Sequence, residues 1–563
     1  MAVLSTPRRF QRLFIIALLV LTTWYLFLTR YNNSSLLLLP TKDNTGKYKY
    51  IPSSYDWSKR PFKHPFNSST LTHLPIGTPR QLPRIQHDFS KDQTNNLHTQ
   101  LQRKRKNAVK QSAKKSYHSY RKYAFGHDEL SPLRLKGIQS FAGWGATLVD
   151  SLDTLWIMGL KTEFLEAVSK VATIDWANTT ADSCNLFETN IRYLGGLLSA
   201  YDLSNQEYKV LLNKAIELAD MLYSAFDTPN HMPANNFHFD KAKKGELIPN
   251  QAESSAAVGT LSLEFTRLSQ LTGDSKYFNA IDGIKKSMER TQDETALPGM
   301  WPVFVDLENG FDVSRGNTFN MGASADSAYE YLSKMYLLLG GLDEEYKRMH
   351  LKAVDAASKH VVFRPMVPDG EKTHDILFSG TVMSNGRTVE LLTEVQHLGC
   401  FTGGMFALGG KLFEVEEDVK IGERLARGCA WAYEVFPSGI MPEVSDVLAC
   451  DRDEKGELNL CEWDEEKWTG GGRLPKPFFS VRNPQYLLRP EAIESVFILY
   501  RITGEKEWLD VAWRMFERVK KATETKHAHS AISDVRVKAG DTIKTDSMEV
   551  SLSFHPKDFG TFC

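Results

Sequence analysis

Apolar residues recur with a helical period through most of the chain, and many of these runs end at a glycine. Examples are residues 156–159, 271–273, 339–341, 407–410 and 502–504. Glycine directly after a helical run is a common terminator because it adopts the left-handed conformation at little cost. Strand-like alternation between the runs is scarce. The pattern predicts an all-α domain in which helix pairs repeat around a common centre, as in an α/α toroid.

A second regularity is a carboxylate at the start of an apolar helical run. It is Glu188 in FETNIR, Asp326 in ADSAYE and Glu491 in RPEAIE. An acid in the first turn often only complements the helix dipole, and Glu188 and Arg192 have the spacing of an ordinary surface pair. The helices that follow are apolar enough to be buried, however, and a buried charge is paired or functional. Several acidic helix ends around one pocket would suit sugar hydrolysis, which uses two carboxylates across a glycosidic bond.

The N-terminal part of the chain differs from the rest. Residues 13–29 carry no charge, are just long enough to span a bilayer, and follow three arginines. This pattern predicts a cytoplasmic tail at 1–12 and a transmembrane signal anchor at 13–29. A cleaved signal peptide is the alternative, but no clear small-x-small cleavage site supports it. Residues 30–95 are predicted to be an extended lumenal stem before a domain at 96–563.

Composition and charge narrow the compartment and the partners. The formal charge of -1 gives no reason to expect nucleic acid as a partner. The basic stretch at 104–115 fits a solvated face of the domain's first helix better than a nucleic-acid patch, because the chain carries an anchor. Four N-x-S/T sequons and six cysteines, which permit one or two disulfides, agree with a secretory compartment.

Six segments of the chain together resemble one family. They are LVDSLDTL (148–155), FETNIRYLGGLLSAY (187–201), DSAYEYLSKM (326–335), HLGCFTGGMFALG (397–409), GIMPE (439–443) and LRPEAIES (488–495). In this order they resemble the class I α-1,2-mannosidases, glycoside hydrolase family 47. The resemblance implies a seven-repeat (αα) barrel, commonly on a type II membrane anchor. It also implies inverting removal of terminal α-1,2-linked mannose from high-mannose N-glycans in the endoplasmic reticulum or Golgi.

The resemblance assigns roles residue by residue. Glu188 matches the general acid, which acts through water. Asp326 and Glu491 match the other two catalytic carboxylates, and Glu491 is the candidate for the base that activates water. The matched substrate-binding positions are Arg192, Glu330, His397, Glu443, Arg489, Glu494 and Glu549. For His397, a satisfied core histidine is an equally good interpretation.

The resemblance also implies one disulfide, between Cys400 and Cys429. Cys450 and Cys461 lie close together in an acidic insert that contains tryptophan, and they are the candidates for a second bridge. The other two cysteines would then be left over.

Three positions depart from the family pattern. Ala257 stands where the family often has Glu, so one pocket acid is missing. Ser324 stands where members with strict single-mannose specificity carry Arg, which argues against that narrow specificity. After Glu549 the chain leaves the family's last helix and its calcium-binding Thr. The barrel is therefore expected to be incomplete at its C-terminal helix. The family implies calcium, but no residue is assigned as its ligand.

The altered ending leaves more than one function open. Residues 550–563 fit a frame slip, a retained intron or a genuine truncation, and the chain as written is expected to be unstable or inactive. The leading prediction is a monomeric, calcium-dependent mannosyl-oligosaccharide 1,2-α-mannosidase that acts on high-mannose N-glycans. The alternatives are a lectin-like homologue that binds high-mannose glycans in glycoprotein degradation, and a non-functional product.

Overall fold

The computed structural model of the chain describes residues 48–92, 96–368, 375–454 and 456–548. The chain divides into two compact units, Met1–Tyr50 and Ile51–Cys563, and all the elements named below belong to the second. The predicted tail, the predicted anchor and Glu549 lie outside the described residues. Within the described ranges, no helix combines the length and the apolar character needed to cross a bilayer.

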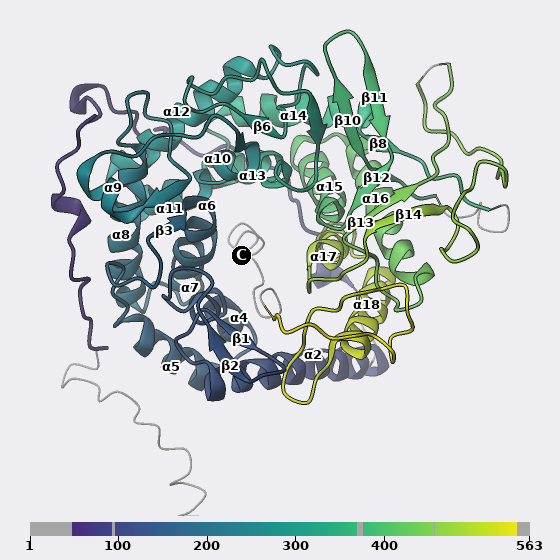
Figure 1. The fold of residues 1–563 in the computed structure, drawn as a ribbon, viewed down its shortest axis with the longest axis horizontal. Helices are drawn as coiled ribbons and strands as arrows, with labels where there is room; N and C mark the ends of the chain where they lie inside the picture. The colour runs from purple at the N-terminus through teal and green to yellow at the C-terminus, as the bar shows by residue number, and fades with distance from the viewer. Residues whose placement is uncertain (1–47, 93–95, 369–374, 455, 549–563) are drawn as a thin grey trace, which may run out of the picture. The chain divides into compact units, whose positions relative to one another are not determined.

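Helices fill most of the second unit and follow one another in pairs (Figure 1). The first members are α4 (Leu152–Ile157), α7 (Gly195–Leu203), α11 (Ser262–Thr272), α13 (Asp326–Leu338), α15 (Thr402–Phe413) and α17 (Glu491–Thr503). Their partners are α5 (Lys161–Val171), α8 (Lys209–Tyr223), α12 (Ser275–Thr291), α14 (Glu344–His360), α16 (Glu416–Val435) and α18 (Glu507–Thr523). Each first member packs against its partner and against the next first member, which gives an inner and an outer layer.

Close packing between the layers depends on small residues in the inner helices. A Cβ on Gly403 of α15 would lie 2.9 Å from the carbonyl oxygen of Gly422 in α16. A Cβ on Gly422 would lie 2.5 Å from the carbonyl oxygen of Gly403. Neither position accepts a side chain unless the helices move apart, so α15 and α16 meet backbone against backbone.

Helix α2 (Asn96–Tyr123) joins the last helix pair to the first. Arg105 of α2 forms an ion pair with Asp510 of α18 at 2.7 Å, and Arg121 forms one with Glu166 of α5 at 2.6 Å. The basic first helix predicted from the sequence is therefore partly used in contacts between helices. Each of the other outer helices above follows an inner partner, whereas in the described ranges α2 does not.

Short antiparallel strands lead into the inner helices, so the prediction of an all-α fold is too narrow. The strands are β1 (Glu129–Ser131), β2 (Lys136–Ile138), β3 (Ser183–Asn185), β4 (Asn236–His238), β5 (Glu253–Ser254), β6 (Phe304–Val305), β7 (Thr318–Asn320), β8 (Val362–Phe363), β9 (Phe378–Ser379), β10 (Thr381–Ser384), β11 (Val389–Leu392), β12 (Glu394–Gln396), β13 (Val444–Val447) and β14 (Phe478–Asn483). They pair as β1–β2, β3–β4, β5–β6, β8–β9, β11–β10–β7 and β12–β13–β14. The described unit is mostly helical, with these small sheets added.

Four of these strands fix where inner helical segments begin. Strand β3 runs directly into α6 (Leu186–Thr189), and β5 runs into α10 (Ser255–Gly259). Strand β7 precedes α13 and β14 precedes α17, each after a short connection. The N-terminal ends of these helical segments therefore adjoin the strands, and Glu188, Asp326 and Glu491 lie at or near those ends.

Residues 51–92, which fall in the predicted stem, run along the outer helices, and we call this segment the strap. Ser53 Oγ donates to Glu217 of α8 at 2.6 Å, and the main-chain N–H of His87 donates to the carbonyl of Arg501 in α17 at 2.8 Å. Arg60 forms an ion pair with Asp227, and both side chains are buried, at 1% and 0% exposure. The strap thus contacts helix pairs that are far apart in the sequence.

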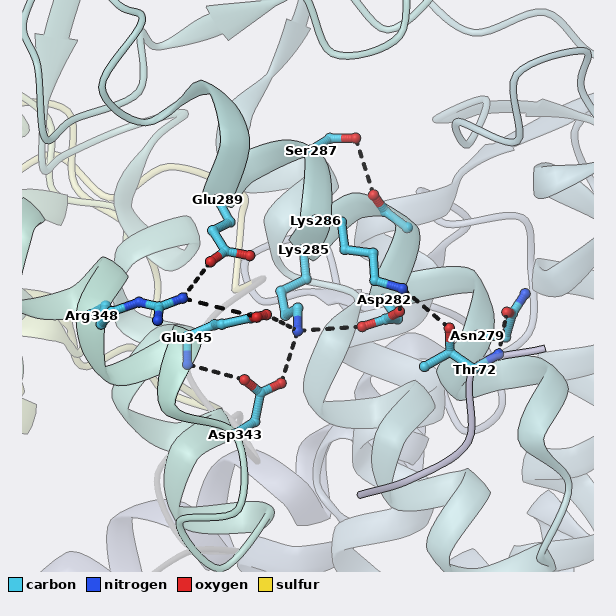
Figure 2. A network of polar contacts seen from close by, with 11 residues as sticks. Thr72, Asn279, Asp282, Lys285, Lys286, Ser287, Glu289, Asp343, Glu345 and Arg348 are labelled. Carbon is cyan, nitrogen blue, oxygen red and sulfur yellow. Dashed lines mark hydrogen bonds and ion pairs between the residues drawn. The ribbon is translucent and has the colours of Figure 1, made fainter. Parts of the chain in front are cut away.

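Figure 2 shows the strap beside an ion-pair network between α12 and α14. Lys285 Nζ lies 2.9 Å from Asp343 and 3.4 Å from Asp282, and it also pairs with Glu345. The main-chain N–H of Thr72, in the strap, donates to Asn279 of α12 at 2.8 Å. Burial opposes the charge on Lys285, but the hydrogen bonds that it donates to Glu345 and Asp343, together with the charges of Asp343 and Asp282, outweigh this effect and raise its pKa. The lysine therefore stays charged and ties the two outer helices together.

Candidate active site

Glu188 lies in the first turn of α6, directly after β3. The Asn185 side chain caps this helix by accepting a hydrogen bond from the Glu188 N–H at 2.8 Å. The chain then forms a π-helical turn, η4 (Asn190–Leu194), before α7, and such turns are frequent at functional sites. Arg192, in this turn, donates from Nε to Glu188 Oε2 at 2.7 Å. The Glu188 side chain is 31% exposed and that of Arg192 8%, so a buried cation holds an accessible carboxylate.

Asp326 is the first residue of α13, and its Oδ1 accepts a hydrogen bond from the Ser327 N–H at 2.7 Å. One turn later Glu330 is buried and accepts from Lys334 Nζ at 2.7 Å. Glu330, Lys334 and Glu494 line one small cavity between α13, α15 and α17. The structure therefore brings two predicted substrate-binding carboxylates together around a buried lysine.

Glu491 is the first residue of α17 and faces His397. His397 Nδ1 lies 3.6 Å from Glu491 Oε2, and His397 Nε2 lies 2.7 Å from the Tyr433 hydroxyl. Burial raises the pKa of Tyr433 well above its ordinary value, so the hydroxyl keeps its proton and can either donate to Nε2 or accept from it, according to the tautomer of the ring. In the tautomer with its proton on Nδ1, His397 directs that N–H toward Glu491 and accepts from Tyr433 at Nε2. Within the described ranges, neither His397 Nδ1 nor Glu491 Oε2 has a hydrogen-bond partner, and both atoms are buried against each other.

Glu443 and Arg489 form an ion pair next to this histidine. The Glu443 side chain accepts from Arg489 Nε and from the Leu487 N–H, the latter at 3.2 Å. The His397 N–H donates to the Glu443 carbonyl at 2.8 Å. The predicted residues His397, Glu443, Arg489 and Glu491 therefore form one connected group. Glu549, the remaining predicted substrate-binding residue, lies outside the described residues.

The two substituted pocket positions lie at the starts of α10 and α13. Ala257 is buried in the first turn of α10, where its N–H donates to the Ser254 hydroxyl at 3.1 Å. Glu253 does not replace the missing acid, because its carboxylate accepts hydrogen bonds from two asparagine side chains. Ser324 has a left-handed backbone conformation, with φ of 70°, and its carbonyl accepts from the Ala256 N–H at 3.0 Å.

Three residues of the site were not singled out by the sequence. Asp150 contacts Arg192, Lys334 contacts Glu330, and Tyr433 contacts His397. Asp150 and Lys334 lie in two of the segments that carry the resemblance, and a charge within an apolar run was the available signal. Tyr433 lies in α16 with no local signal, because its role depends on which inner helix packs against it.

Both predicted disulfides are present. Cys400–Cys429 links η7 (Leu398–Phe401) to α16, and Cys450–Cys461 closes the acidic loop. Cys184 is free, and Cys563 lies outside the described residues.

The described residues do not supply a ligand set for the calcium that the family resemblance implies. Across the described part of the chain, no three His, Cys, Asp or Glu side chains gather as a metal site. The carboxylates of the site instead contact arginine, lysine and histidine. No residue is therefore assigned to calcium, and no step below passes through a metal.

Carboxylates lie at the starts of several inner helical segments, each in a different environment, and carboxylates are the groups that glycoside hydrolases use. The chain belongs to glycosyl hydrolase family 47, whose model matches residues 112–554, and this confirms the family predicted from the six segments.

Curated relatives and a solved structure agree with this assignment. The mannosyl-oligosaccharide alpha-1,2-mannosidase 1B of Aspergillus oryzae is 33% identical over 448 residues, which cover 77% of this chain and 82% of the relative. The mannosyl-oligosaccharide 1,2-alpha-mannosidase MNS3 of Arabidopsis thaliana is 33% identical over 468 residues, covering 77% and 71%. The alpha-1,2-mannosidase from Trichoderma reesei superposes with a TM-score of 0.70 at 29% identity, covering 81% of this chain and 92% of that one.

Proposed function

We propose that this chain removes terminal α-1,2-linked mannose from high-mannose N-glycans with inversion of the anomeric centre. The names of the relatives supply the substrate class. The observation that carries the proposal is the contrast between two carboxylates at helix starts. Glu188 is held by a buried arginine, whereas Glu491 presents to His397 an oxygen that has no hydrogen-bond partner among the described residues. We assign Glu188, which Arg192 fixes in place, to deliver a proton through water, and Glu491 to accept one.

Each residue then has a defined step. A water molecule attacks the anomeric carbon and gives its proton to the Glu491 carboxylate. We assign His397 the tautomer with its proton on Nδ1, from which it orients that carboxylate through Oε2. The glycosidic C–O bond breaks, and the leaving oxygen receives a proton from Glu188, relayed by water. Asp326 supplies negative charge near the oxocarbenium-like transition state. Acid and base on different helices leave room for water, as inversion requires.

The finer structural features are also part of the proposal. We propose an (αα)7 barrel, supported by α2, which completes the outer layer between α18 and α5. A type II anchor at 13–29, with the unit in the endoplasmic reticulum or Golgi lumen as a monomer, is supported by the uncharged run and its arginines. Calcium dependence rests on the family alone. Ala257 and Ser324, which are smaller than the residues they replace, support a broader choice of mannose branch.

Mannose release from a high-mannose N-glycan by the purified full-length chain tests the activity, and proton NMR of the first product tests inversion. We expect the β-anomer first. Glu491→Gln should lower kcat by roughly 10²–10⁴-fold, the range for loss of a general base. Glu505→Gln, which removes an exposed acid just beyond α17, is the matched control and should leave kcat unchanged.

Two further arms complete this test. A chelator followed by added Ca²⁺ separates calcium dependence from the activity itself. Glycan binding without any release of mannose would contradict the hydrolase and support the lectin-like alternative. An α-anomer as first product would contradict the roles given to Glu188 and Glu491, because it indicates retention.

A further inference from the structure

Asp150 lies behind the residue that holds the proposed general acid. It is the last residue of α3 (Ala146–Asp150), and α3 packs against the π-helical turn that carries Arg192. Arg192 Nη1 is 3.4 Å from Asp150 Oδ2, while Arg192 Nε is 2.7 Å from Glu188 Oε2. One guanidinium therefore joins two carboxylates, and of these Asp150 is the more deeply buried.

The guanidinium is also confined on its face. The Arg192 Cζ lies 4.6 Å from the centre of the Phe141 ring, a distance that allows a cation–π contact. A planar guanidinium that stacks on a ring and has an acid at one edge keeps only a narrow range of orientations. The direction of the Arg192 Nε–H bond therefore depends on what fixes the other edge of the guanidinium, at Nη1. The position of the Glu188 carboxylate depends on that direction in turn.

A second carboxylate nearby does not take over this role. Asp153 is fully buried and accepts hydrogen bonds from Ser199 Oγ at 3.0 Å and from the Thr154 N–H at 2.6 Å. Burial, with a smaller contribution from the charge of Asp150, raises its pKa to about 7. Tyr193, the next residue along the chain, donates its hydroxyl to Asp128 at 3.1 Å. Glu188 and Asp150 form ion pairs with Arg192.

We propose that Asp150 is a positioning residue, whose carboxylate anchors the Arg192 guanidinium so that Nε holds Glu188 in the orientation needed for proton transfer. This inference rests on the proposed hydrolase function. Asp150 contacts Arg192 and acts on the reaction through it. Its loss changes the placement of the acid rather than glycan binding, so it should alter kcat more than KM.

Two variants separate anchoring from charge. Asp150→Ala removes the anchor, and we expect kcat to fall about 10²-fold with KM within about twofold, the scale of a misplaced catalytic group. Asp150→Asn keeps an oxygen that can accept from Nη1, so it should recover about tenfold of that loss.

Glu166→Gln is the matched control, because it breaks the Glu166–Arg121 ion pair at the outer layer without touching the site. Its kcat should equal that of the unaltered chain. Thermal unfolding of every variant shows which losses come from misfolding. Unchanged kcat in Asp150→Ala, or equal losses in its Ala and Asn variants at full folding, would overturn the proposal.

A crystal structure of each variant provides a readout that needs no turnover. We expect the Arg192–Glu188 contact to be lost in Asp150→Ala and kept in Asp150→Asn. If the unaltered chain released no mannose, the proposed function would fail, and these structures would still decide whether Asp150 positions Arg192. An intact Arg192–Glu188 contact in Asp150→Ala would refute the positioning role.

Discussion

Burial gives neighbouring acids of this chain different protonation behaviour. Glu188 is partly exposed and has a cationic partner, whereas Asp153 is fully buried and accepts hydrogen bonds from neutral groups. A buried carboxylate without a cation favours its protonated form, because desolvation penalises the charge. The residue types alone did not distinguish these two acids, since both follow apolar residues in the sequence.

The protonation of Asp153 predicts a pH-dependent difference in stability. Its folded-state pKa of about 7 lies above the ordinary value of 3.8, so the folded state binds the extra proton between these values. The stabilisation is complete below about pH 4 and is lost as pH rises through 7, a change of up to about 4 kcal/mol. Asp153→Asn cannot ionise, so it should gain stability relative to the unaltered chain over this window. Urea unfolding of both proteins at several pH values checks this, and a constant difference would contradict it.

A second prediction at this scale concerns the histidine beside Glu491. Tyr433→Phe removes the hydroxyl that bonds His397 Nε2 and leaves a buried nitrogen without that partner, which should cost about 1–3 kcal/mol. The proposed tautomer with the proton on Nδ1 is then no longer favoured, and kcat should fall. Tyr277→Phe is the control, because that buried hydroxyl donates to Asp220 between outer helices. Nitrogen NMR of His397 reads the tautomer, and an unchanged spectrum in Tyr433→Phe would refute the assignment.

At the scale of elements, the glycine pattern predicted some helix ends correctly and one helix end wrongly. Gly273 and Gly504 are left-handed and end α11 and α17, as the sequence predicted. The run at 407–410 does not end a helix, because α15 continues to Phe413 and Glu414 takes the left-handed position. There Gly409 serves packing, since a Cβ would lie 1.9 Å from His350 Nε2. The local sequence cannot distinguish a glycine that ends its helix from a glycine that packs against another helix, because that other helix is distant in the sequence.

This difference predicts opposite effects for two Gly→Ala substitutions within helices. Gly409→Ala forces its methyl group against the buried His350 ring and should destabilise the protein by about 1–3 kcal/mol through overpacking. Gly283→Ala, in the middle of α12, meets no atom within 4 Å and should stabilise it by about 0.5–1 kcal/mol. Thermal unfolding of both variants measures the contrast. Equal shifts of the same sign would show that helix propensity, rather than packing, decides.

At the scale of the described unit, the sequence predicted elements and residue types better than the contacts between them. The Glu188–Arg192 pair was foreseeable because both residues lie on one helical segment. The contact between His397 and Glu491 was not, because it depends on how η7 and α17 pack. The strap was predicted only as an extended segment. Its contacts combine backbone hydrogen bonds, isolated polar pairs and separate aromatic contacts, such as Phe66 with Tyr223 and Phe89 with Tyr500. None of these follows a regular apolar period in the sequence.

The buried Arg60–Asp227 pair predicts that the strap contributes to stability. Breaking a buried ion pair costs about 3–5 kcal/mol, so Asp227→Asn should lower the free energy of unfolding and speed proteolysis within residues 51–92. Lys59→Gln is the matched control, because it removes the Lys59–Asp56 pair of the same segment, in which the lysine is 82% exposed. That change should alter stability by no more than about 1 kcal/mol.

The same contact gives the strap a pH dependence. Burial opposes the charge on Asp227, but hydrogen bonds from the His64 N–H, Arg60 and the Lys63 N–H outweigh it and lower the pKa. A lowered folded-state pKa stabilises above the ordinary value of 3.8, and this stabilisation is lost as pH falls through the folded value. Proteolysis of the strap by an acid-active protease should therefore accelerate below that value in the unaltered chain. In Asp227→Asn the cleavage should already be fast at neutral pH. A protease that is active at neutral pH measures that cleavage rate. Equal cleavage of the two proteins at neutral pH would show that the Arg60–Asp227 pair does not hold the strap against the helices.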